Sequence, residues 1–122
     1  MTIKDLTPSL VWNIFYDITR VPRPSKKEGK IREFLIDFAK NHNIAYKVDD
    51  AGNVAMFRPA APGCENAPRI VMQGHMDMVC EKDANVQHDF DNDPIETIID
   101  GEWVRANGTT LGADNGIGMA AG

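Results

Sequence analysis

The sequence is short of cysteine and of long apolar runs. Cys64 and Cys80 are the only cysteines among 122 residues. Two cysteines are too few for a disulfide-stapled secreted scaffold, so we expect reduced thiols. No apolar run approaches the roughly 20 residues that span a bilayer, and the N-terminus lacks the basic and apolar segments of a signal peptide. These absences favour a cytoplasmic location.

Positive charge is also scarce. Lys and Arg number 13 against 18 Asp and Glu, which gives a formal net charge of -5. This balance argues against nucleic acid or an anionic membrane as a partner. The apolar fraction of 43% is ordinary for a globular protein, and the length suits one small domain covering residues 1–122.

Helical and strand patterns alternate along the chain. Apolar residues at helical spacing predict a helix after Thr7-Pro8 that stops at "VPRPS", and Ser25 with Glu28 matches a capping box for a second helix. Hairpins are predicted for residues 44–57 and 95–106, the latter turning at Asp100-Gly101. The run "RIVMQGHMD" predicts a buried strand that ends near Gly74. The pattern indicates an α/β fold with a central mixed sheet flanked by helices.

The polar residues that follow this buried run are candidates for chemistry. His75 and Asp77 are two positions apart, so in an extended strand they point to the same side. An imidazole is a good zinc ligand, and the carboxylate could bind a metal or accept the second ring N–H. An ordinary hydrogen-bonded polar pair explains the same two residues.

A third candidate is Asp114 in "LGADNGIG". The surrounding glycines allow close backbone approach, and a carboxylate is favoured at the start of the small-residue helix expected there. It has two oxygens and could bridge two cations. A simple N-cap is the alternative interpretation.

Two motifs together resemble a known family. "VMQGHMDMVCEK" and "GTTLGADNGIG", in this order, are similar to the zinc dipeptidases of the M20 metallopeptidase family, and "YDITRVPRPSKKEGKIREFL" and "DDAGNVAM" extend the resemblance over most of the chain. It implies a two-zinc site in which His75 ligates one zinc, Asp77 supports that histidine as a catalytic residue, and Asp114 bridges both metals. A cis peptide bond after Asp114 is also implied.

The same resemblance implies a function and a partner. The expected reaction is hydrolysis of dipeptides, with Xaa-His as the preferred substrate, by a water that two Zn²⁺ ions activate; Co²⁺ or Mn²⁺ could replace zinc. Homodimerisation is expected of the complete enzyme. The family pattern continues with a Glu-Glu pair, a further acidic ligand and a histidine that these 122 residues do not contain. We therefore expect an N-terminal part of a catalytic domain that is inactive by itself. The final "GMAAG", which looks like a helix cut short, agrees with this.

Other interpretations carry less weight. His42 and His88 match no family position, and we expect both to be solvated. "HDFDNDP" spaces its aspartates like an EF-hand loop, but Pro94 replaces the required glycine, so an acidic surface loop is expected. A different class of function also remains: a non-catalytic piece that only folds or associates. Metal dependence distinguishes it from the hydrolase.

Overall fold

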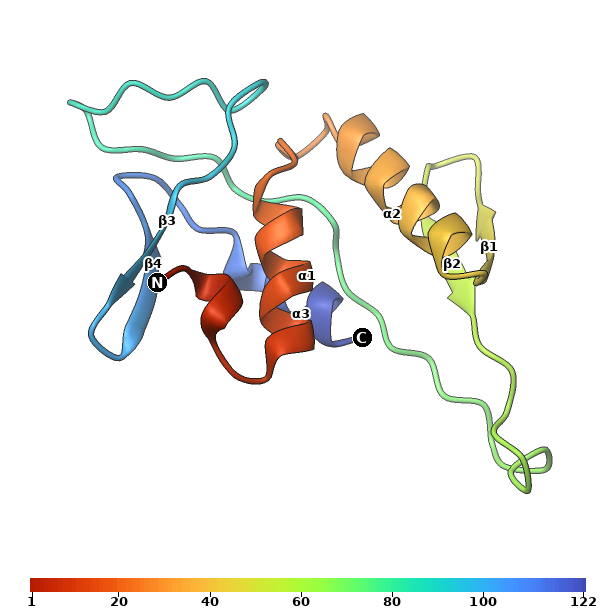
Figure 1. Ribbon diagram of the computed structural model, residues 1–122. Helices are drawn as coiled ribbons and strands as arrows, with labels where there is room; N and C mark the ends of the chain where they lie inside the picture. The colour runs from red at the N-terminus through yellow and green to blue at the C-terminus, as the bar shows by residue number, and fades with distance from the viewer. The chain divides into compact units, whose positions relative to one another are not determined.

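A computed structural model describes all residues, Met1–Gly122 (Figure 1). It divides into two compact units. The first contains Met1–Ile31 and Gly74–Gly122, and the second contains Arg32–Gln73. The elements in chain order are η1 (Ile3–Asp5), α1 (Ser9–Thr19), α2 (Gly29–Asn41), β1 (Ala45–Val48), β2 (Val54–Phe57), β3 (Thr97–Asp100), β4 (Trp103–Ala106) and α3 (Ala113–Ala121). None of the helices is both long and apolar enough to cross a membrane.

The first unit is built on α1 and α3, which lie side by side in Figure 1. Helix α1 buries Phe15 and Ile18 along one stripe, as its apolar spacing predicts, although Leu10 at its start is exposed. It ends at Thr19, before Pro22. Gly116 lets α3 approach closely, because a Cβ there would lie 3.0 Å from the Phe15 ring.

The two predicted hairpins are confirmed. Strands β1 and β2 pair antiparallel with Val48 opposite Val54, and β3 and β4 pair with Asp100 opposite Trp103. Gly101 has φ +62° in the second turn, a conformation that glycine adopts without steric cost. In the second unit the Arg32 Nε–H donates to the Gly52 carbonyl at 2.8 Å, which fixes the first turn.

The α/β class is confirmed, but the sheet differs from the expected one. The strands form two separate antiparallel pairs instead of one mixed sheet. The run that was predicted as a buried strand is extended and unpaired, and Ile70, Val71 and Met72 are each more than 70% exposed. A buried strand needs neighbours at its edges and a layer on each face. The described residues supply neither for this run.

Candidate active site

The loop that carries His75 and Asp77 is fixed by the segment that follows α1. Pro24 and Met78 form an isolated parallel bridge, and the Met78 N–H donates to the Arg23 carbonyl at 3.0 Å. The Arg23 guanidinium donates to the carbonyls of Met76 at 3.1 Å and Asp77 at 3.0 Å. Both the course and the carbonyl orientation of this loop are therefore determined by residues about fifty positions earlier.

The same arginine reaches the loop that carries Asp114. Its Nη2 donates to the Gly112 carbonyl at 2.5 Å, and Gly112 has φ +76° at the N-terminal cap of α3. Arg23 is 2% exposed. Burial lowers the pKa of its guanidinium, and the charges of Asp77 and Cys80 oppose that shift. One buried side chain thus joins both loops of the candidate site.

The three predicted site residues meet in space. His75 Nδ1 lies 2.9 Å from Asp77 Oδ1, and His75 Nε2 lies 3.1 Å from Asp114 Oδ1. The His75 side chain is 50% exposed, Asp77 28% and Asp114 97%. The peptide bond between Asp114 and Asn115 is cis, as the resemblance implied. The imidazole therefore lies between two carboxylates at a surface that a ligand can reach.

The carboxylates change the proton affinity of the site. The hydrogen bond that the imidazole donates to Asp114 raises the pKa of His75, partial burial opposes this rise, and Asp77 adds to it. Asp77 has its pKa lowered, first by a hydrogen bond from the Ser25 hydroxyl and then by His75. Asp77 is therefore an anion at neutral pH and holds the proton of His75 on Nδ1.

The donor set fits a metal ion between His75 and Asp114. With Nδ1–H bonded to Asp77, a neutral imidazole directs the Nε2 lone pair at the Asp114 carboxylate. Two electron-rich atoms at 3.1 Å need a proton or a cation between them. Ligands at about 2.0–2.1 Å from one tetrahedral zinc lie about 3.3 Å apart, close to this separation. No group of three or more His, Cys, Asp or Glu in the chain is arranged to hold a metal. His75 and Asp114 are thus two candidate donors, fewer than a full set of ligands.

The sequence interpretation missed two residues at this site. Ser25 does not cap α2, which begins at Gly29; its Oγ instead donates to Asp77 Oδ2 at 2.5 Å. Glu28 accepts from the Lys26 N–H, so the predicted capping box is wrong. Arg23 was read only as part of a helix stop. Its only sequence signal is a charged residue between two prolines.

The other histidines do not join the site. His42 is exposed, as expected. The expectation for His88 was wrong, because its ring stacks edge-on against Phe90 and its Nε2 is buried with no hydrogen-bond partner. The acidic loop is exposed and contributes an ion pair between Asp91 and Lys27 at 3.0 Å.

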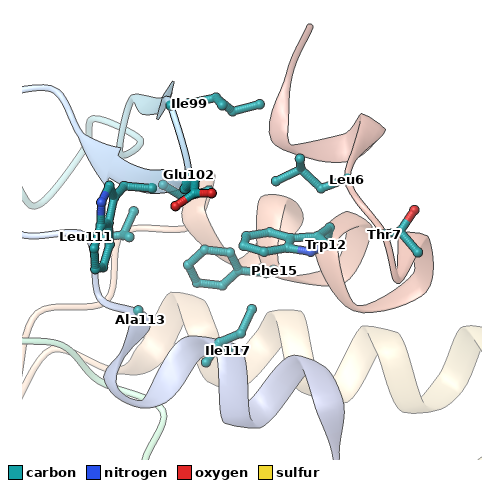
Figure 2. A pocket seen from close by; sticks show the side chains of 12 residues that line it. Leu6, Thr7, Trp12, Phe15, Ile99, Glu102, Leu111, Ala113 and Ile117 are labelled. Carbon is teal, nitrogen blue, oxygen red and sulfur yellow. The ribbon is translucent and has the colours of Figure 1, made fainter.

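An apolar pocket of about 420 Å³ lies beside the start of α3 in the first unit. Figure 2 shows the rings of Trp12 and Phe15 from α1 facing Ile117 from α3, with Ala113 at its margin. Its position next to Asp114 places apolar surface close to the candidate site. Its walls are Leu6, Thr7, Trp12, Phe15, Ile99, Gly101, Glu102, Trp103, Val104, Leu111, Ala113 and Ile117.

Comparison with known proteins confirms the resemblance to M20 metallopeptidases that the motifs indicated. Over 119 residues, 98% of this chain, it is 45% identical to the cytosol non-specific dipeptidase of Escherichia coli strain K12 and covers 24% of that protein. The crystal structure of the aminoacylhistidine dipeptidase from Vibrio alginolyticus matches 99% of this chain with a TM-score of 0.96 at 45% identity. The chain covers 25% of that structure, so it spans about a quarter of these relatives. No family model matches the chain.

Proposed function

We propose that this chain is the N-terminal part of the catalytic domain of a zinc-dependent dipeptidase. The observation that carries the proposal is the 3.1 Å separation of His75 Nε2 and Asp114 Oδ1, with Nδ1 bonded to Asp77. In this arrangement His75 and Asp114 would hold one zinc ion, and Asp77 would fix the tautomer and orientation of His75. The second oxygen of Asp114 would be available to a second zinc ion.

The residues of the chain have separate roles in the proposed reaction. A zinc ion held by His75 and Asp114 would supply Lewis acidity, polarising the scissile carbonyl and lowering the pKa of a water toward about 7. His75 supplies a neutral nitrogen ligand, since Asp77 keeps its proton on the other ring atom. Asp114 supplies negative charge at a position that is open to solvent and substrate. Co²⁺ or Mn²⁺ would fit the same ligands, because His and carboxylate bind several divalent metals.

The substrate is proposed from the relatives. Both are named as dipeptidases, one non-specific and one acting on aminoacyl-histidine. We take dipeptides, including those that end in histidine, as the substrate class. A cytoplasmic location and a homodimer of the complete protein belong to the same proposal.

The 122 residues are proposed to bind zinc weakly and to hydrolyse no dipeptide by themselves. A catalytic zinc site uses about three protein ligands plus a water. His75 and Asp114 would provide two, and the Glu-Glu pair of the family pattern, whose first member would act as the base, is not among these residues. The exposed Ile70, Val71 and Met72 support a larger domain, because such a patch is ordinarily covered.

The test compares two proteins in one assay. A dipeptide ending in histidine is offered to the 122-residue chain and to the product of the full reading frame, with zinc and with a chelator. We expect turnover only by the full product with zinc, and its loss in His75→Ala. Turnover by the short chain would refute the proposed incompleteness. A full product with no metal-dependent turnover would favour the non-catalytic alternative.

A further inference from the structure

The Ser25 hydroxyl lies on the far side of Asp77 from the imidazole. Its Oγ donates to Asp77 Oδ2 at 2.5 Å, while Asp77 Oδ1 faces His75 Nδ1 at 2.9 Å. These are the two side-chain contacts that the structure gives the Asp77 carboxylate. Each oxygen of the carboxylate therefore has one side-chain partner, and the two partners fix its plane.

Backbone contacts hold the serine in this place. Its neighbour Pro24 forms the bridge to Met78, and Arg23 exchanges backbone and side-chain hydrogen bonds with the same loop. Ser25 and Lys26, which has φ +69°, form a turn that is closed by a 2.9 Å hydrogen bond from the Lys27 N–H to the Pro24 carbonyl. The serine thus lies in a turn beside the loop of Asp77, before helix α2 begins.

We propose that Ser25 is a positioning residue for the metal site: its hydroxyl anchors Asp77 Oδ2 so that Oδ1 stays on His75 Nδ1 and Nε2 stays available to a metal. This inference rests on the proposed function. The terminal torsion of an aspartate is broad, so a carboxylate with one anchor samples rotations that one with two anchors does not. Without the Ser25 hydroxyl, the hydrogen bond from His75 Nδ1–H to Asp77 Oδ1 is formed for a smaller fraction of the time, and the imidazole ring samples more orientations.

If the Ser25 hydroxyl served folding alone, its removal would lower stability first. The segment of Ser25 remains joined to the loop of Asp77 by Arg23 and Pro24 when the hydroxyl is removed. Ser25 is itself exposed, so its substitution opens no cavity. Loss of the hydroxyl is therefore expected to change the site before it changes stability.

The experiment measures the zinc affinity of the 122-residue chain by competition with a chromophoric chelator. We expect Ser25→Ala to weaken zinc binding by about tenfold, the lower end of the effect for residues that orient metal ligands. Ser25→Thr retains a hydroxyl and should bind within about twofold of the original chain. Ser25→Val has the shape of threonine without the hydroxyl and should behave like Ser25→Ala. The control Ser9→Ala removes the other serine hydroxyl, which is exposed at the start of α1, and should have no effect.

A second readout needs no metal. Two-bond ¹⁵N–¹H spectra of neutral His75 should show the Nδ1–H tautomer in the original chain and in Ser25→Thr. A larger Nε2–H fraction is expected in Ser25→Ala and Ser25→Val. Equal zinc affinity and equal tautomer fractions in all variants would overturn the role of Ser25. If the original chain binds no zinc, the proposed zinc binding by these 122 residues fails, and the tautomer spectra still decide whether Ser25 positions Asp77 and His75.

Discussion

Replacing Arg23 by methionine should destabilise the first unit strongly. Methionine keeps much of the length and apolar bulk of the side chain but removes every donor. Three carbonyls, those of Met76, Asp77 and Gly112, then lose the guanidinium that binds them at 3.1, 3.0 and 2.5 Å. Because Arg23 is 2% exposed, little water can take the place of the lost donors.

The magnitude follows from those three hydrogen bonds. A hydrogen bond to a charged group contributes about 1.5–3 kcal/mol, and desolvation of the guanidinium offsets part of that. Taking about 1 kcal/mol as the net contribution of each bond, the free energy of unfolding should fall by about 3 kcal/mol. The two loops of the site should also separate, so zinc affinity should fall in the same variant.

Urea denaturation followed by tryptophan fluorescence measures this change, because Trp12 and Trp103 both lie in the first unit. The matched control is Arg105→Met in the same unit. Arg105 pairs with Asp100 at the surface, and loss of such a pair costs less than about 1 kcal/mol. If Arg23→Met costs no more than the control, the guanidinium does not hold the two loops together.

Two further predictions concern the same site. Gly112→Ala should lower the free energy of unfolding by about 3 kcal/mol, because a Cβ at φ +76° would be strained and would meet Arg23 Nη2 at 2.5 Å. The control Gly101→Ala, at φ +62° in open space, should lower it by about 1 kcal/mol. Urea denaturation measures both changes. Equal costs would contradict the close approach. In the metal-free chain, NMR should show His75 titrating above about 6.5 and Asp114→Asn lowering its pKa toward that value. The stabilisation from this pair is then complete below the unfolded pKa and disappears as pH rises through the raised folded one. An unchanged pKa in Asp114→Asn would show that the carboxylate does not bind the imidazole.

Local patterns in the sequence predicted the elements that depend on near neighbours. The turn residues around Gly52 and Gly101 determine both hairpins, and the spacing of Phe15 and Ile18 determines the buried stripe of α1. The run from residue 69 to 77 was wrongly read as buried. Apolar side chains favour burial, but whether a strand is buried depends on neighbouring elements that the local sequence does not specify.

The candidate site was predicted in part. His75, Asp77 and Asp114 meet as expected, since glycines and the family motifs mark them. The roles of Arg23 and Ser25 depend on contacts with residues about fifty to ninety positions away. A local pattern assigned Ser25 to a helix cap, the partner available within three residues. Only the fold shows that the carboxylate of Asp77 is the partner instead.

The central claim is that His75 and Asp114 bind the same metal ion. Zinc affinity, measured by chelator competition on the full chain and on three variants, tests it most directly. The account predicts weak binding by the original chain, at least a tenfold loss in both His75→Ala and Asp114→Asn, and no change in the matched control His42→Ala, since removing one ligand of a metal removes much of its affinity. Unchanged affinity in His75→Ala or Asp114→Asn, or an equal loss in His42→Ala, would contradict it.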